Sequence, residues 1–327
     1  MTQTFAVVLA AGKGTRMKSE LPKVLHPVCG KPMVQHITDK LARLSVDQTV
    51  TVVGHKSEMI KNQLGDAVKY AMQQEQLGTA HAVKMAERQL ADKEGTTLII
   101  TGDTPLVTEQ TIQNLMDHHR ETNAAATILT MNTEDPSGYG RIIRNENGDV
   151  ERIVEQKDAS EEELAVKEVN SGIFCFDNQK LFTSLDKVST NNNQSEYYLP
   201  DVIEILKNEG EVISASSTDD VEEAMGVNDR VHLATAERIL RERIHLHHMK
   251  NGVTIIDPSS AYIEADVTIG QDTTIEPRVH LRGTTKVGKK CMVGPDVDLI
   301  DFELEDETRI SNFSMTNDLY KMPIGQA

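Results

Sequence analysis

The feature that most limits the possible folds is a six-residue repeat late in the chain. After Gly252, aliphatic side chains recur at a constant spacing, at Ile263, Ile269, Ile275, Leu281, Val287, Val293 and Leu299. This period is typical of a parallel β-helix, in which each aliphatic side chain points into a narrow interior and stacked coils bury it. The register slips at Leu304, five residues after Leu299, and Ile310 resumes the spacing of six. We therefore expect a short β-helix over residues 251–327.

The earlier part of the chain shows apolar strands that alternate with amphipathic helices. Strands are predicted at 4–12, 48–55 and 96–103, and helices at 31–44 and 78–90. Residues 124–154 read as a further strand and a hairpin, and 168–177 as another strand. The alternation predicts a mostly parallel sheet covered on both faces. The chain of 327 residues then divides into a first domain (1–228), an amphipathic linker helix (229–250) and a partial β-helix (251–327).

Composition excludes several classes of function. The net charge of −17 argues against a nucleic-acid surface, which needs a basic patch. The three cysteines are far apart and lack metal-ligand spacing, which predicts no disulfide framework, no zinc site and a reducing compartment. The apolar stretch Phe5–Ala11 is too short to span a membrane and has no basic leader, so we expect a cytoplasmic protein. His245, His247 and His248 do not share one helical face, which argues against a metal site.

The first strand runs directly into a glycine-rich loop, in the stretch VVLAAGKGTRMKSELPKVLH at residues 7–26. Exposed backbone N–H groups at Gly12 and Gly14, followed by cations, are suited to a phosphorylated ligand. The dinucleotide fingerprint is excluded because Met17 stands where its third glycine belongs, and the Walker loop is excluded by its spacing. Arg16 and Lys23 are the cations that we expect to face the phosphates.

This loop resembles the signature of sugar-phosphate pyrophosphorylases, and further segments match in order. They are QEQLGTAHA (74–82), TGDTPL (101–106), GYGRI (138–142), IVEQKDA (153–159), VNSGIF (169–174), SEYYLPD (195–201) and GVND (226–229). With the repeats behind them, the chain resembles the bifunctional bacterial N-acetylglucosamine-1-phosphate uridyltransferase / glucosamine-1-phosphate acetyltransferase family. The resemblance implies a Rossmann-like nucleotidyltransferase domain, a linker helix and a left-handed parallel β-helix. The family's acetyltransferase site lies in later coils, so acetyl transfer is not expected from this chain.

The resemblance implies a Mg²⁺-dependent reaction between UTP and N-acetylglucosamine-1-phosphate. A sugar-phosphate oxygen attacks the α-phosphorus in line, and the products are UDP-N-acetylglucosamine, a precursor for peptidoglycan and the cell wall, and pyrophosphate. Arg16 and Lys23 are the implied catalytic cations, and Asp103 and Asn228 the implied metal ligands. Asp103 also directly follows an apolar strand, at the edge where open α/β sheets bind ligands.

The resemblance also implies the residues that contact the substrates. They are Leu9, Ala10, Ala11, Gly12 and Gly14 for the nucleotide; Gln73, Gln76, Gly78 and Thr79 for uracil; Gly140, Glu155, Asn170 and Tyr198 for the acetamido sugar; and Asn228 beside the metal. Taken alone, Gly140 also fits a role in a turn, and Tyr198 a role in core packing. A homotrimer built through the β-helix is a further expectation from the family.

Two alternatives stay open at this point. One is another sugar-1-phosphate nucleotidylyltransferase that uses glucose-1-phosphate or dTTP, which a substrate panel would identify. The other is a non-catalytic, nucleotide-sensing assembly subunit, which would bind nucleotide without turnover. The presence of Arg16, Lys23, Asp103 and Asn228 together favours an enzyme.

Overall fold

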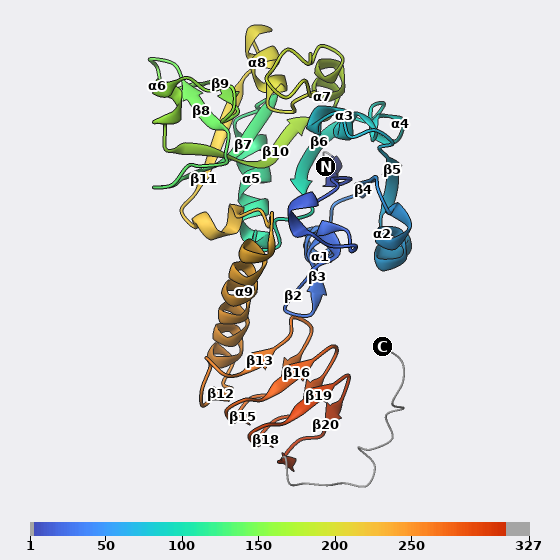
Figure 1. Ribbon diagram of the computed structural model, residues 1–327, viewed down its shortest axis with the longest axis vertical. Helices are drawn as coiled ribbons and strands as arrows, with labels where there is room; N and C mark the ends of the chain where they lie inside the picture. The colour runs from blue at the N-terminus through green and yellow to red at the C-terminus, as the bar shows by residue number, and fades with distance from the viewer. Residues whose placement is uncertain (1–2, 312–327) are drawn as a thin grey trace. The chain divides into compact units, whose positions relative to one another are not determined.

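The computed structural model describes residues 3–311, which form two compact units (Figure 1). The first unit contains the residues up to His26 and Pro32–Ala236, and the second contains Pro27–Lys31 and the residues from Glu237 onward. The division falls inside the long helix α9 (Arg230–Lys250), within the segment interpreted from the sequence as a linker. A short piece of the N-terminal region therefore belongs to the second unit, which the order of the sequence did not predict.

A nine-stranded mixed sheet forms the centre of the first unit. Its main path is β11-β7-β10-β6-β1-β4-β5, and β8 and β9 join it through β10. The strands are β1 (Gln3–Ala10), β4 (Gln48–Val53), β5 (Lys69–Met72), β6 (Gly95–Thr101), β7 (Ala126–Asn132), β8 (Arg141–Arg144), β9 (Val150–Val154), β10 (Glu168–Asp177) and β11 (Ile213–Thr218). The pairs β1–β4, β1–β6, β4–β5 and β7–β11 are parallel, as the strand and helix alternation predicts.

Strand β10 is the antiparallel element in the middle of this sheet, paired with β6 and β7. The chain reaches it from the β8–β9 hairpin, which confirms the hairpin predicted within 124–154. The connection from β9 to β10 contains only the four-residue helix α6 (Glu161–Leu164), which is too short to serve as the crossover helix of a parallel connection. The register between β10 and β7 shifts between Asn170 and Phe174, so the ladder is interrupted beside a predicted sugar-binding residue.

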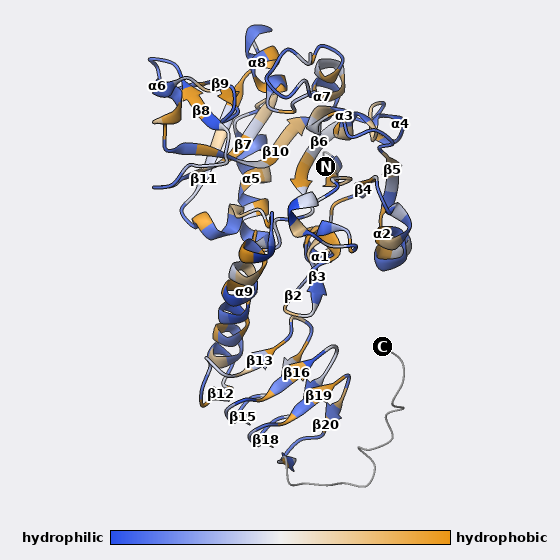
Figure 2. Ribbon diagram, viewed as in Figure 1, coloured by the Kyte–Doolittle hydropathy of each residue, from blue (hydrophilic) through white to orange (hydrophobic). Residues whose placement is uncertain are grey.

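Helices cover both faces of the sheet. One face packs against α1 (Met33–Arg43), α2 (Ser57–Leu64) and α5 (Glu109–Glu121), and the other against α3 (Thr79–Lys84), α4 (Glu87–Leu90), α7 (Asn178–Leu185) and α8 (Asp201–Asn208). Successive residues of β1 alternate between the two cores, since Val7 packs on one face and Val8 on the other. Strands β6 and β10 are coloured as hydrophobic in Figure 2, as expected for strands buried on both faces.

Shorter helices complete the first unit. They are α6 (Glu161–Leu164) and the 3₁₀ helices η1 (Thr15–Met17), η2 (Lys23–Leu25), η3 (Gly65–Ala67) and η4 (Val221–Ala224). The helix predicted over 78–90 is two helices, α3 and α4. Met85 and Ala86 donate to carbonyls three residues earlier, so tight turns replace regular helical bonds at the break.

The six-residue repeat forms coils with three parallel ladders in the second unit. The ladders are β12-β15-β18-β21, β13-β16-β19 and β14-β17-β20. Their strands are β12 (Thr254–Ile255), β13 (Tyr262–Ile263), β14 (Thr268–Ile269), β15 (Thr274–Ile275), β16 (His280–Arg282), β17 (Lys286–Val287), β18 (Met292–Val293), β19 (Asp298–Ile300), β20 (Glu303–Leu304) and β21 (Arg309–Ile310). Leu281 pairs with Ile263 on one side and Leu299 on the other, which confirms the predicted stacking. Leu304 pairs with Val287, so the slip is a coil shortened by one residue.

The Pro27–Lys31 segment is held on the first coil by three polar contacts and a close fit at Gly30. It is flanked by the paired strands β2 (Pro27–Val28) and β3 (Lys31–Pro32). Cys29 N–H donates to Glu237 Oε2 at 2.5 Å, and Ala265 N–H donates to the Cys29 carbonyl at 2.9 Å. Lys31 Nζ forms an ion pair with Asp266 at 2.6 Å. Gly30 adopts φ +79°, and a Cβ there would lie 2.2 Å from the Glu264 carboxyl carbon, so glycine is required for this fit.

The three cysteines, Cys29, Cys175 and Cys291, are buried and unbridged. Across residues 3–311, no helix combines the length and the apolar character needed to cross a membrane.

Candidate active site

The glycine-rich loop leaves the sheet at the carboxyl end of β1. Gly14, at φ +60°, directly precedes η1, and a Cβ on it would lie 2.5 Å from the Cβ of Lys23. Gly12 has no atom within 4 Å of the position that its Cβ would take. Glycine at position 14 therefore lets Lys23 lie against the loop, while Gly12 presents open backbone to a ligand.

Four residues predicted to act on the phosphates lie together beside this loop. The Lys23 ammonium contacts the Asp103 carboxylate, and the two side chains are 16% and 15% exposed. The Asn228 side-chain oxygen accepts a hydrogen bond from Arg16 Nη2 at 2.9 Å and one from Lys23 Nζ at 3.4 Å. Val227 N–H donates to the Asp103 carbonyl at 2.9 Å, which holds Asn228 next to Asp103.

A cavity of about 270 Å³ opens next to these residues. It lies where the neighbouring strands β1 and β6 end, since Ala10 and Thr101 both line it. Its walls include ten of the predicted site residues: Leu9, Ala10, Ala11, Gly12, Lys23, Gln73, Gln76, Gly78, Thr79 and Asp103. Most of the predicted nucleotide-binding residues are thus gathered around one hollow at the edge of the sheet, whereas Gly14 and Arg16 do not line it.

The segment predicted to contact the base is fixed by backbone bonds to residues 197–199. Gly78 adopts φ +122°, and a Cβ there would lie 2.4 Å from the Tyr197 carbonyl oxygen. Ala80 N–H donates to that oxygen at 2.9 Å, and Thr79 Oγ1 accepts from Leu199 N–H at 2.9 Å. Glycine is therefore required at position 78, and the N-terminus of α3 is anchored against the Tyr197–Leu199 segment.

Three of the four predicted sugar-binding residues form a second group. Asn170 N–H donates to the Gly140 carbonyl at 2.9 Å, and a Cβ on Gly140 would lie 3.3 Å from Glu155 Oε1. Asn170 Oδ1 accepts from Gly172 N–H at 2.9 Å, which fixes its amide at the interruption of β10. Tyr198, the fourth, is buried, and its hydroxyl accepts from Gln194 Nε2 at 2.5 Å. None of these four residues lines the 270 Å³ cavity.

Two carboxyl groups near the predicted sugar site, those of Glu155 and Asp201, have a raised pKa. Burial raises the pKa of Glu155, and the neighbouring charges of Asp158 and Asp201 raise it further, while Arg141 opposes them. Burial raises the pKa of Asp201 to about 6, with Glu204 and Asp158 adding to the shift. The pKa of Tyr198 is also raised, mainly by burial. This region therefore gains protons more readily than exposed carboxylates would.

The oxygens of Asp103 and Asn228 converge on one point, which the Lys23 ammonium takes in this structure. A cation thus already lies between the two donors, and carboxylate and amide oxygens are ligands that Mg²⁺ accepts. Across residues 3–311, no group of three or more His, Cys, Asp or Glu side chains is placed to hold a metal. A magnesium ion held by Asp103 and Asn228 would complete its coordination with phosphate and water oxygens, so these residues fit the group.

Four cavity residues were not predicted from the sequence: Val24, Ala82, Thr101 and Glu196. Thr101 is the last residue of β6, so its place at the carboxyl end of a buried strand could have marked it. Glu196 comes from the loop before α8, and no local pattern places that loop beside β1. The sequence also gave no reason to single out His81, whose ring lies against the Gln73 side chain.

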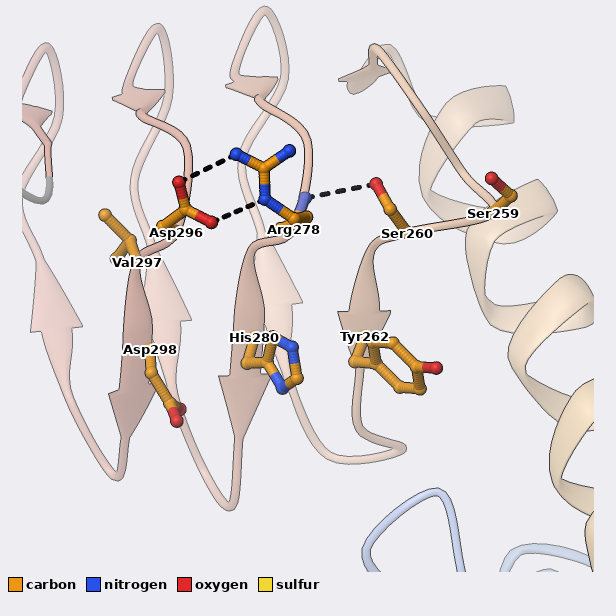
Figure 3. A pocket seen from close by; sticks show the side chains of 8 residues that line it. All are labelled: Ser259, Ser260, Tyr262, Arg278, His280, Asp296, Val297 and Asp298. Atoms are coloured by element: carbon orange, nitrogen blue, oxygen red, sulfur yellow. Dashed lines mark hydrogen bonds and ion pairs between the residues drawn. The ribbon is translucent and has the colours of Figure 1, made fainter.

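A separate groove of about 510 Å³ lies on the coils of the second unit (Figure 3). Within the groove, the Arg278 guanidinium donates to the Asp296 carboxylate at 2.6 and 2.8 Å. The Tyr262 and His280 rings stack with centroids 4.8 Å apart. None of the predicted site residues lines this groove.

The fold and the site together define a class of protein. Residues 5–221 match the family described as "Nucleotidyl transferase". A solved structure from Bacillus anthracis, described as a glucose-1-phosphate thymidylyltransferase in complex with a sucrose, superposes with a TM-score of 0.59. The match covers 73% of this chain and 96% of that one at 18% identity, so it supports the fold alone. The chain is therefore a nucleotidyl transferase.

Closer relatives narrow this class. The chain is 56% identical over 307 residues to the bifunctional protein GlmU of Enterococcus faecalis, covering 94% of this chain and 67% of that protein. It is 56% identical over 310 residues to GlmU of a Geobacillus species, covering 95% and 68%, and 58% identical over 295 residues to GlmU of Bacillus cereus, covering 90% and 64%. The chain belongs to the GlmU family and spans about two thirds of the length of these relatives.

Proposed function

We propose that the protein transfers a uridylyl group from UTP to N-acetylglucosamine-1-phosphate, with release of pyrophosphate. The observation that carries the proposal is the convergence of Arg16, Lys23, Asp103 and Asn228 beside the 270 Å³ cavity. The product, UDP-N-acetylglucosamine, would serve peptidoglycan and cell-wall synthesis in the cytoplasm. The family membership supports the same choice of substrates.

The reaction needs charge neutralisation more than proton transfer. The attacking sugar-phosphate oxygen is already an anion at neutral pH, so no general base is required. Arg16 and Lys23 supply positive charge where two polyanions must meet, and the open backbone at Gly12 supplies N–H donors. Lys23 is held in place by Asp103, and its ammonium can turn from that carboxylate to a phosphate oxygen.

Asp103 and Asn228 would hold the magnesium ion. When bound, Mg²⁺ supplies charge stabilisation to the phosphate oxygens. Gln73 and Gln76 line the cavity, and because their amide nitrogens contact protein acceptors, their side-chain oxygens would serve as acceptors for a pyrimidine edge. Glu155 and Asn170 offer a carboxylate and an amide to sugar hydroxyl and acetamido groups, with the Gly140 backbone beside them.

The test is pyrophosphate release by the purified protein with Mg²⁺, UTP and N-acetylglucosamine-1-phosphate. Parallel reactions replace the sugar with glucose-1-phosphate or the nucleotide with dTTP. Release with the first pair alone supports the proposal in full. Preferential release with another pair would replace the substrates proposed here, and nucleotide binding without release would favour the sensing subunit.

Two further parts of the proposal concern the second unit. We expect no acetyl transfer from acetyl-CoA to glucosamine-1-phosphate, since the Arg278 guanidinium of the coil groove is already bound by Asp296 (Figure 3). Thiol release above background would contradict this expectation. We also expect a homotrimer built through the coils, which light scattering would test by giving three times the mass of one chain.

A further inference from the structure

The side-chain amide nitrogen of Gln73 contacts two hydrogen-bond acceptors. Its Nε2 donates to the Gly78 carbonyl at 3.2 Å and lies 3.1 Å from Nδ1 of His81. A backbone carbonyl can only accept, so the atom against Gly78 must be the amide nitrogen. That nitrogen carries two hydrogens, and the second is directed to His81, whose Nδ1 must then be the unprotonated ring nitrogen.

The oxygen of the same amide is the atom that can accept a hydrogen bond from a ligand in the cavity. Gln73 lines the 270 Å³ cavity although its side chain is only 3% exposed. Within residues 3–311, no protein donor is recorded for Gln73 Oε1, and this oxygen is not among the buried atoms that lack a partner. It therefore remains accessible as a hydrogen-bond acceptor for a ligand.

The surrounding structure keeps both acceptors in place. Gln73 N–H donates to the Val53 carbonyl at 2.8 Å, which continues the pairing of β5 with β4. His81 lies on α3, whose N-terminus is bonded to Tyr197, and the His81 and Tyr197 rings approach with centroids 6.4 Å apart. A half-turn of the Gln73 amide would place its oxygen against the Gly78 carbonyl, which cannot donate, and would require His81 to carry its ring proton on Nδ1 instead of Nε2.

We propose that His81 is a positioning residue that fixes the Gln73 amide with its oxygen toward the base, and so makes the site select uracil over cytosine. Uracil presents a donor, N3–H, where cytosine presents an acceptor, N3. An oxygen held in the cavity bonds the first and repels the second. The inference rests on the proposed function in one respect, namely that this cavity receives the base of UTP.

The experiment compares UTP with CTP for the wild-type protein, His81→Leu and His81→Asn. Leucine removes the acceptor, whereas the Asn side-chain oxygen can take nearly the position of Nδ1. We expect His81→Leu to lower the ratio of kcat/KM for UTP to that for CTP by about 5- to 10-fold, as loss of one orienting hydrogen bond implies. His81→Asn should keep the ratio within about 3-fold. His81→Leu should raise the KM for UTP and leave kcat for UTP nearly unchanged.

Binding of UTP and CTP, measured by calorimetry on the same three proteins, separates this inference from the proposed function. If the wild-type protein prefers UTP in binding and His81→Leu loses the preference, the inference holds even without pyrophosphate release. A His81→Leu protein that unfolds at the wild-type temperature and keeps the full UTP preference would overturn it. So would a wild-type protein that binds both nucleotides equally. His247→Leu, at an exposed histidine of α9, is the control and should change neither ratio.

Discussion

Lys23 and Asp103 form an ion pair at the point where two neighbouring parallel strands end, with both side chains about 85% shielded from solvent. Asp103 follows β6, and Lys23 begins η2 after the loop that leaves β1. The pair therefore holds a cation and a carboxylate side by side at the edge of the sheet, where we propose that they meet a phosphate and a metal. Several expected outcomes depend on this arrangement.

Substitution of Asp103 by alanine should lower turnover by about 100-fold or more. The loss removes charge stabilisation in the transition state and also leaves Lys23 without its anchor. Pyrophosphate release at saturating substrates measures the effect. Asp117→Ala removes a carboxylate from an exposed ion pair on α5 and serves as the control. An Asp103→Ala protein that turned over like the wild type would refute the assignment of this residue.

Alanine at position 14 should lower turnover by about 10-fold or more through displacement of Lys23. Its Cβ would lie 2.5 Å from the Lys23 Cβ, and the left-handed backbone adds strain of about 1 kcal/mol. Gly210, just after the end of α8, also has a positive φ of +82° and no atom within 4 Å of its Cβ position. Gly210→Ala therefore carries left-handed backbone strain without the displacement. Equal activity losses in the two variants would show that strain alone is responsible.

The KM for the sugar phosphate should rise as pH falls below neutral. Burial and the charges of Asp158 and Asp201 raise the pKa of Glu155, so this carboxylate gains a proton at higher pH than an ordinary glutamate. The protonated form accepts sugar hydroxyls less well. Asp201→Asn removes one of these charges and should move the rise in KM to lower pH. A pH profile that is identical in the variant and the wild type would exclude this coupling.

The second unit should lose stability as pH falls from about 6.5 to 4. Burial lowers the pKa of both His245 and His248 to about 4, whereas each titrates near 6.5 when unfolded. Above pH 6.5 both histidines are neutral in the folded and the unfolded states, and the free energy of unfolding is at its full value. As pH falls below 6.5, protons bind the unfolded state first and lower the free energy of unfolding. The loss should reach about 2 kcal/mol per histidine near pH 4.5.

Thermal unfolding between pH 7.5 and 4.5 measures this loss. His245→Leu should unfold at a temperature that depends less on pH, because it removes one of the two titrations. His55→Leu, at an exposed histidine of the first unit, is the comparison and should keep the wild-type slope. If the slope is unchanged in His245→Leu, the buried histidines do not control acid stability.

The coils could be predicted from the sequence because their packing is local and periodic. Each of the aliphatic residues from Ile263 to Leu299 meets a partner one coil away, and the same rule operates at every step. The antiparallel direction of β10 was not predicted, because strand direction depends on how the preceding hairpin folds back. The break between α3 and α4 was likewise missed, since apolar spacing does not report a switch to tighter turns.

For the site, motif order predicted the neighbourhood of Lys23, Asp103 and Asn228 but not every wall of the cavity. Lys23 and Asp103 follow strands that pair, so topology alone brings them close. Glu196 and His81 reach the site through contacts between loops and helices that leave no periodic signal in the sequence. The roles given to individual residues in binding each substrate stay predictions until the variants are measured.

The contact between Cys29 and Glu237 joins residues 208 positions apart. During synthesis, the Pro27–Lys31 segment leaves the ribosome long before Glu237 and Ala265 exist. The amide and carbonyl groups of Cys29 are therefore left to water while the whole sheet of the first unit is being made. The first corner of the β-helix can close only when Glu237 and Ala265 reach this segment, so residues 27–31 and the first coil complete their fold together.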